Sequence, residues 1–110
     1  MAEEGAERAG GAGGASVSDA RMETLAHHRG CIDRIDRTIV ALLAERVRLG
    51  MALGDLKREL RLPLRSDARE AEVLTRVRAA AGGPLSSQSA MRIFSAIIAE
   101  TSAAQERVHD

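Results

Sequence analysis

The sequence predicts an all-α fold of three helices, one of them very long, in an intertwined helical homodimer. Large apolar residues recur at heptad spacing from about residue 25 to residue 60, and no proline interrupts this stretch. A sustained heptad pattern is typical of a helix that packs along another helix. No segment alternates apolar and polar residues as a half-buried strand does.

The long helix is predicted to begin at Ser18 or Asp19 as N-cap and to run to about Arg61, shortly before Pro63. Its apolar side chains form two rows, which we call the seam. The first row holds Leu25, Ile32, Ile39, Leu53 and Leu60, and the second holds Ile35, Leu42, Leu49 and Leu56. A helix of about 40 residues is not stable alone, so the seam must face a partner helix from the same chain or from a second copy.

A second, shorter helix is predicted from Asp67 to about Ala81. Asp67 and Glu70 have the spacing of a capping box, in which two residues three apart bond each other's backbone at a helix start. The inner face of this helix holds Leu74, Val77 and Ala81, and Glu70 lies one turn before Leu74 on the same face. Glu70 therefore lies on the apolar face of its helix.

The third helix is predicted to follow a break at residues 82–84, with Ser86 or Ser87 as N-cap and an end near Val108. Its inner row advances in steps of three and four residues. The row consists of Met91, Phe94, Ile98, Thr101, Gln105 and Val108. Two members of this otherwise apolar row are polar, Thr101 and Gln105.

Composition excludes several classes of function. The chain has 110 residues, which suits one domain, with 16 basic and 16 acidic side chains and a single aromatic residue. This balance does not favour a nucleic-acid surface, because base stacking needs aromatic side chains. Residues 1–18 are Ala-, Gly- and Glu-rich and are predicted to be a disordered tail, which leaves residues 19–110 as the domain.

Membrane, export and metal signals are missing from the sequence. No apolar run approaches the roughly 20 residues of a membrane span, and the first residues lack the pattern of a signal peptide. We therefore expect a cytoplasmic protein. The three histidines are not at metal-ligand spacing, so neither a metal nor a cofactor is expected.

Four polar residues interrupt the predicted apolar faces: Arg46, Glu70, Thr101 and Gln105. Arg46 stands in the first row of the seam, where the pattern asks for Ile or Leu. A guanidinium on a packing face is costly unless an anion meets it. Each residue alone could fix the register or oligomeric state of a bundle. Together, their complementary character favours a polar pocket between helices.

Lys57 is the only lysine of the chain, and it joins this set. It follows Arg46 by almost three helical turns, so both side chains project from one side of the helix with Cα atoms about 16 Å apart. They can bracket a small anionic ligand. Arg29 is a further candidate, but about 42 Å of helix separate it from Lys57. If Arg29 serves the same kind of site, it must come from a second chain in an antiparallel dimer.

The sequence resembles the all-helical chorismate mutases over about residues 22–108. The resemblance rests on Leu42-Leu43-Ala44-Glu45-Arg46, Gly54, Lys57, Arg65, Arg69-Glu70, Phe94, Ile97-Ile98 and Gln105. Members of that family are dimers of three-helix chains that convert chorismate to prephenate on the way to phenylalanine and tyrosine. The resemblance implies the same isomerase activity here, with chorismate, a small dianion, as the ligand and no cofactor.

The resemblance also implies catalytic and binding roles. Arg46 would bind one substrate carboxylate, and Arg29, contributed in trans by the second chain, would bind the other. Lys57 and Gln105 would act as the catalytic residues by hydrogen-bonding the ether oxygen of the breaking bond. Glu70 would hold the ring hydroxyl.

Three further positions are implied to line the pocket. Arg69 would support it from the rim. Thr101 stands where the family usually has Ser and would keep a hydroxyl near a carboxylate. Ser66 stands where bacterial homologues often have Asp, so the hydroxyl site differs there, although the Ser66 backbone can still serve it.

Several alternatives remain open. Isochorismate-pyruvate lyase and aminodeoxychorismate mutase share the fold and the Arg and Lys positions, although the pair Arg69-Glu70 favours the ordinary mutase. A non-catalytic helical dimerisation module would use the same seam. A nucleic-acid binder would use the basic run, which we interpret mostly as a solvated edge with the rim of the site. That run consists of Lys57, Arg58, Arg61, Arg65 and Arg69.

Overall fold

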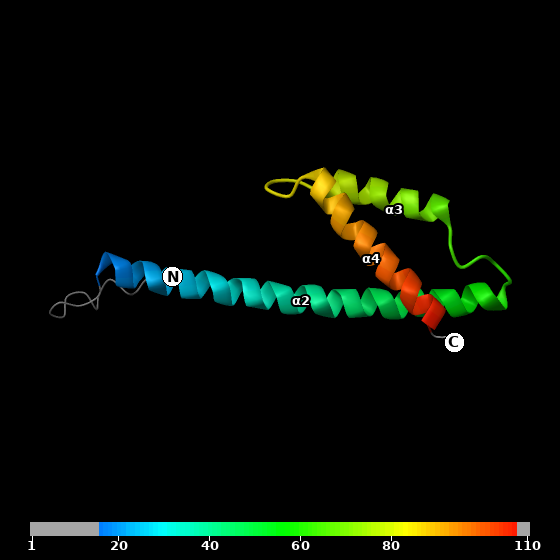
Figure 1. Ribbon diagram of the computed structural model, residues 1–110, viewed down its shortest axis with the longest axis horizontal. Coiled ribbons are helices and arrows are strands. Elements are labelled where there is room, and N and C mark those ends of the chain that lie inside the picture. The colour runs from blue at the N-terminus through cyan, green and yellow to red at the C-terminus, as the bar shows by residue number, and fades with distance from the viewer. Residues whose placement is uncertain (1–15, 108–110) are drawn as a thin grey trace. The chain divides into compact units, whose positions relative to one another are not determined.

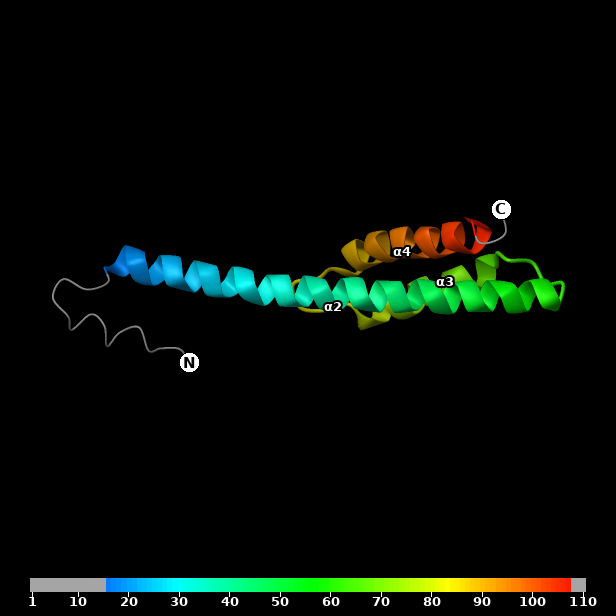
Figure 2. The same ribbon diagram turned by 90° about the horizontal axis from the view of Figure 1, so that it is seen from below.

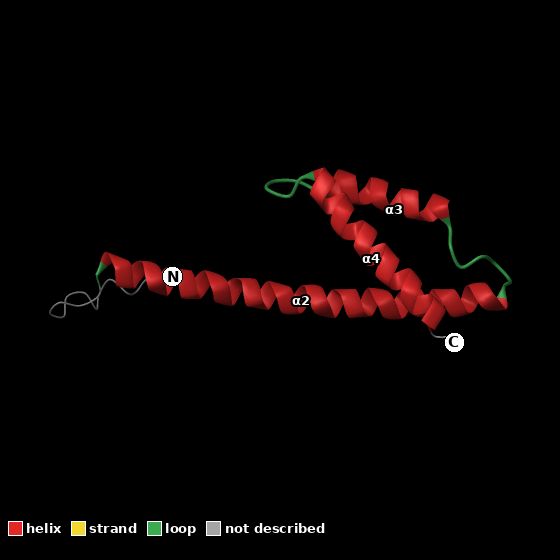
Figure 3. Ribbon diagram, in the orientation of Figure 1, coloured by secondary structure: helices red, strands yellow, loops and turns green. Residues whose placement is uncertain are grey.

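A computed structural model of the chain describes residues 16–107. Three helices occupy this part, α2 (Val17–Glu59), α3 (Asp67–Ala80) and α4 (Ser87–Arg107), and the described residues contain no strand (Figure 3). The all-α prediction with one very long helix is therefore confirmed. The chain divides into two compact units, Met1–Val40 and Ala41–Asp110, so that α2 begins in the first and ends in the second.

None of the helices within residues 16–107 is long and apolar enough to cross a bilayer.

The start of α2 is a capping box formed by Ser16 and Asp19. The Asp19 backbone N–H donates to Ser16 Oγ at 3.1 Å, and the Ser16 N–H donates to Asp19 Oδ2 at 3.3 Å. The predicted N-cap, Ser18 or Asp19, is therefore wrong, because Asp19 serves as the acidic third residue of the box. Val17 and Ser18, placed in the predicted tail, belong to α2; residues 1–15 lie outside the described part.

The end of α2 is set by its own backbone rather than by the proline. The Leu62 N–H donates to the Lys57 carbonyl at 2.8 Å and the Arg61 N–H donates to the Arg58 carbonyl at 3.1 Å. These are the two bonds of a Schellman motif, which needs a left-handed residue after the helix. Arg61 supplies it with a φ of 58°, a conformation that costs a residue with a side chain about 1 kcal/mol.

Serine hydroxyl groups cap the two shorter helices. Ser66 Oγ accepts a bond from the Arg69 N–H at 3.2 Å, so Ser66 is the N-cap of α3 and the expected capping box of Asp67 is not used. Ser86 Oγ accepts from the Ser89 N–H at 3.0 Å, which selects Ser86 of the two predicted caps of α4. The predicted last residue of α4, at position 108, lies outside the described residues.

In the second unit, α3 packs beside α4, and the C-terminal half of α4 crosses α2 (Figures 1 and 2). The crossing lies at Gly50 and Gly54, which are the buried residues of α2. A Cβ atom on Gly50 would overlap with Thr101 Cγ2, and one on Gly54 would lie 3.2 Å from Gln105 Cγ. The two glycines thus let α4 come close enough to place its polar side chains against α2.

Most of the seam is exposed in the single chain. Leu42, Leu49 and Leu56 expose 59%, 65% and 49% of their surface, whereas the apolar residues that are buried among those described are Ala90 and Ala104. The seam residues of the first unit, such as Ile32 and Ile35, are also exposed. Within the second unit, the described residues of the same chain leave Leu42, Leu49 and Leu56 without a helix that covers them. An apolar stripe of this length marks an interaction surface.

Candidate active site

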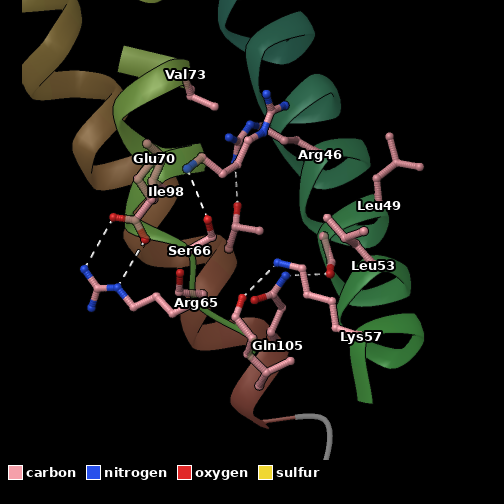
Figure 4. Close-up of a pocket in the computed structure, with 15 residues that line it drawn as sticks. Arg46, Leu49, Leu53, Lys57, Arg65, Ser66, Glu70, Val73, Ile98 and Gln105 are labelled. Carbon is pink, nitrogen blue, oxygen red and sulfur yellow. Dashed lines mark hydrogen bonds and ion pairs between the residues drawn. The ribbon is translucent and has the colours of Figure 1, made fainter. Parts of the chain in front are cut away.

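A pocket of about 260 Å³ lies in the second unit, between α2, α4 and the start of α3 (Figure 4). Gly50 lines the pocket together with polar and apolar side chains. The polar residues are Arg46, Lys57, Arg65, Ser66, Arg69, Glu70, Thr101, Ser102 and Gln105, and the apolar residues are Leu49, Leu53, Leu64, Val73 and Ile98. Every predicted site residue except Arg29 lines this pocket. Arg29 belongs to the first unit and is exposed.

Arg46 reaches the pocket from the seam side of α2. Its Nη1 donates to Thr101 Oγ1 at 2.7 Å, and the same hydroxyl donates to the Ile97 carbonyl at 3.0 Å. Thr101 therefore accepts from the guanidinium while its own proton is used within α4. This bond orients Arg46, but its acceptor is neutral, so it does not compensate the positive charge.

Lys57 lies three turns further along α2, and Figure 4 shows its ammonium on the same side of the pocket as Gln105. Lys57 Nζ donates to the Leu64 carbonyl at 3.0 Å. The left-handed turn at Arg61 makes this contact, because it returns the chain toward the helix it has just left. Here too the acceptor is a neutral oxygen, and the ammonium has two further N–H groups to offer.

Gln105 is the buried polar side chain of the site, with 8% of its surface exposed. Its Nε2 donates to the Gly50 carbonyl at 2.8 Å, and this bond joins α4 to α2 through two residues that are 55 apart in sequence. A carbonyl inside a helix has a second lone pair, so it can accept this bond in addition to its helical one. The amide nitrogen keeps one more N–H for a ligand.

Glu70 is held by Arg65 from the loop before α3. Arg65 Nε lies 3.2 Å from Glu70 Oε2, and Arg65 Nη2 donates to Oε1 at 3.4 Å, so both carboxylate oxygens are engaged (Figure 4). Arg65 Nε also lies 3.7 Å from Asp67 Oδ1. The pairing is solvent-facing on the arginine side, since 72% of the Arg65 side chain is exposed but only 26% of the Glu70 side chain is.

Arg69 and Ser66 form the rim of the pocket. Arg69 Nη1 donates to Glu72 Oε1 at 2.7 Å. This hydrogen bond, with the nearby charge of Arg76, holds the pKa of Glu72 below its ordinary value. The Ser66 Oγ atom accepts the capping bond from the Arg69 N–H, so this oxygen has less hydrogen-bonding capacity left for a ligand in the pocket.

Two cations remain after these pairings. Of the four cationic side chains in the lining, Arg65 is paired with Glu70 and Arg69 with Glu72, whereas Arg46 and Lys57 are bonded to neutral oxygens. The pocket is therefore electropositive between Arg46 and Lys57. Charged donors in a partly enclosed site can hold an anion by charge-assisted hydrogen bonds.

Sequence reasoning missed some of the lining and one tertiary contact of the basic run. Val73 and Ser102 were not singled out, because a Val on a helix and a Ser beside apolar residues carry no distinctive pattern. The basic run as a whole was interpreted mostly as a solvated edge with the rim of the site. Within it, Arg58 Nη2 donates to the Gln105 carbonyl at 3.0 Å and the side chain is 29% exposed, so Arg58 makes a tertiary contact that the run did not indicate.

Within residues 16–107, no three His, Cys, Asp or Glu side chains gather in an arrangement that could hold a metal ion.

Comparison with known proteins gives a consistent result. The model of the family described as chorismate mutase type II matches residues 28–106. A curated relative, the bifunctional chorismate mutase/prephenate dehydratase of Aquifex aeolicus (strain VF5), is 30% identical over 79% of this chain. The match covers 25% of that relative, so the chain spans about a quarter of its length.

Two solved structures are similar in fold. Form II of the chorismate mutase of Thermus thermophilus has a TM-score of 0.72 and 34% identity, covering 79% of this chain and 96% of that one. Form I of the same enzyme has a TM-score of 0.67 and 34% identity, covering 74% of this chain and 98% of that one. Because the model of the type II chorismate mutase family matches most of the length of this chain, the chain belongs to that family.

Proposed function

We propose that the chain is a chorismate mutase, which rearranges chorismate to prephenate in a site shared between two copies. The observation that carries the proposal is the convergence of Arg46, Lys57, Glu70 and Gln105 on one pocket in which Arg46 and Lys57 are bonded to neutral oxygens. Chorismate is a dianion, so it needs cations that an internal carboxylate has not already neutralised. Membership of the family and the chorismate mutase structures of similar fold support the same reaction.

The proposed chemistry is electrostatic. The rearrangement breaks a C–O bond and forms a C–C bond within one molecule, so it needs no nucleophile from the protein. The substrate must instead be held in a compact conformation, with positive charge where the ether oxygen gains electron density. In this proposal Lys57 and the second N–H of Gln105 donate to that oxygen. Removing one such donor in other enzymes costs about 10²–10³ in rate.

The remaining roles follow from what each side chain offers. Arg46, oriented by Thr101, binds a substrate carboxylate through the guanidinium edge that Thr101 does not use. Glu70, held in place by its ion pair with Arg65, accepts from the ring hydroxyl through its free lone pairs. Arg69 and Ser66 both line the pocket, where Arg69 supports it from the rim and the Ser66 backbone can serve the hydroxyl site.

The second carboxylate needs a further cation, which we assign to Arg29 of a second copy. Support comes from the seam, whose exposed leucines and isoleucines call for a partner helix of the same kind. An antiparallel homodimer would cover the seam and bring each Arg29 to the other chain's pocket. Chorismate is then the small-molecule partner, and neither nucleic acid nor a membrane is part of the proposal. A cytoplasmic location stays a prediction, which fractionation of the producing cells tests.

The first experiment adds chorismate to the purified protein and follows its loss together with the formation of prephenate. We expect prephenate as the product. A dimerisation module without chemistry would leave chorismate unchanged, and a lyase would release pyruvate and salicylate from isochorismate. Arg48→Ala serves as the matched control for Arg46→Ala, because Arg48 is an exposed arginine two residues further along α2 that does not line the pocket.

The second experiment tests the shared site. Arg29→Ala and Arg46→Ala are each expected to lose activity, since each removes a carboxylate ligand from both sites of the homodimer. After subunit exchange in an equal mixture, half of the dimers are mixed and each has one intact site, so about a quarter of wild-type activity should return. No return of activity, with exchange verified by mass spectrometry, would contradict the contribution of Arg29 in trans.

A further inference from the structure

Arg58 links the ends of two helices that meet beside the pocket. It lies near the C-terminus of α2, and its Nη2 donates to the backbone carbonyl of Gln105 at 3.0 Å. Its side chain is mostly buried, with 29% exposed. The bond joins residues 47 apart in sequence, so it is a tertiary contact rather than a local one.

The accepting group is the backbone carbonyl of Gln105, in the part of α4 that lies against Gly50 and Gly54 of α2. A carbonyl oxygen has two lone pairs, so it can accept a guanidinium N–H in addition to a bond within the helix. Because the donor is charged, this hydrogen bond is stronger than one between neutral groups. Arg58 therefore ties α4 to α2 at Gln105.

Gln105 is thereby held at both of its ends. Arg58 holds its backbone carbonyl, and the Gly50 carbonyl holds its side-chain Nε2 at 2.8 Å. Gly54 makes room for this arrangement, because a Cβ there would lie 3.2 Å from Gln105 Cγ and 3.6 Å from Arg58 Nη1. With both ends held, the remaining N–H of the amide has a defined direction into the pocket.

The guanidinium gives up hydrogen bonds to make this contact. Arg58 Nη1 is buried with no hydrogen-bond partner within the described part of the chain, and it lies 3.9 Å from Asp55 Oδ1, which is an ion-pair distance but beyond hydrogen-bond length. A buried donor left without a hydrogen bond is unfavourable. An arginine that served only solubility would extend into water instead, so its burial points to a role in the packing of α4.

We propose that Arg58 is a positioning residue for Gln105, which sets the direction of the Gln105 amide toward the reacting bond. This inference rests on the proposed function for its effect on rate, but not for its structural content. A misplacement of about 1 Å in a reacting geometry can cost about a hundredfold in rate. Arg58 itself is not among the residues that line the pocket.

The test is a double-mutant cycle on chorismate turnover with Arg58→Ala, Gln105→Ala and the double variant. Arg58→Ala is expected to lower kcat by about tenfold or more with a smaller change in KM, since it displaces a group that acts in the transition state. In the Gln105→Ala background the same change should have almost no further effect. Arg58→Lys should recover part of kcat, because an ammonium can still donate to the Gln105 carbonyl. Arg48→Ala is the exposed-arginine control and should leave turnover unchanged.

A second readout does not depend on activity. Hydrogen exchange of the peptide covering the last turns of α4 should be faster in Arg58→Ala than in the wild type, while exchange in α3 stays the same. Equal loss of kcat in both backgrounds, unchanged kcat, or unchanged exchange would each overturn the proposal. Absence of turnover in the wild type would instead refute the proposed function, and the exchange measurement would still decide the role of Arg58.

Discussion

Replacing Gly50 with alanine is the most direct test of how α2 and α4 meet. Helix propensity alone favours the change by about 1 kcal/mol, since glycine is the poorer helix former. The structure predicts the opposite sign. A Cβ at Gly50 would overlap with Thr101 Cγ2, and Thr101 is a stiff β-branched side chain that cannot move away without losing its bond to Arg46.

The expected magnitude follows from two costs set against that gain. Overpacking costs about 1–3 kcal/mol, and weakening the buried bond from Gln105 to the Gly50 carbonyl adds about 0.5–1.5 kcal/mol. After the propensity gain of about 1 kcal/mol is subtracted, we expect a net loss of about 2 kcal/mol. For a domain of this size that lowers Tm by about 10 °C.

The assay is thermal unfolding followed by circular dichroism at one fixed protein concentration, because the Tm of an oligomer depends on concentration. Gly30→Ala is the matched control. Gly30 also lies in α2, but a Cβ there meets nothing within 4 Å in the chain, so its Tm should rise. If Gly50→Ala unfolded at or above the wild-type Tm, as helix propensity alone would give, the inference that α4 packs too closely on Gly50 to admit a Cβ would be wrong.

Three further substitutions test the site and its supports. Lys57→Ala should lower kcat by about 10²–10³ while circular dichroism stays that of the folded protein, since the bond that Lys57 makes within residues 16–107 is to the Leu64 carbonyl; a near-normal rate would remove Lys57 from the mechanism. Ser66→Ala should cost about 1 kcal/mol in urea unfolding through the lost bond to the Arg69 N–H, whereas Ser66→Asp should stay within a few tenths; equal losses would show that the hydroxyl is not the cap. Arg61→Gly should raise stability by about 0.5–1 kcal/mol, because glycine adopts a φ of 58° without strain; a decrease would mean that the Arg61 side chain makes a stabilising contact.

Sequence reasoning predicted the helices and the polar residues that interrupt their apolar faces. Heptad spacing, turn residues and caps are local signals, so the number and order of helices in the described part follow from them. The errors in the helices were confined to their ends, where Ser16 and the left-handed Arg61 decide the boundaries of α2 through specific bonds. Residues such as Arg46 and Gln105 stood out because a charged or polar group on an apolar face needs a reason.

Helical periodicity assigns each residue to a face, so the amino-acid order is enough to show that cations and hydrogen-bond donors interrupt the packing faces of three helices. Which of those cations are already paired became known from the folded chain. Arg65 is bound to Glu70 and Arg69 to Glu72, while Arg46 and Lys57 are bonded to neutral oxygens, and Arg58 donates to the Gln105 carbonyl of α4. Pairing depends on distances of a few ångströms between segments far apart in the chain, and helical periodicity carries no information about those distances.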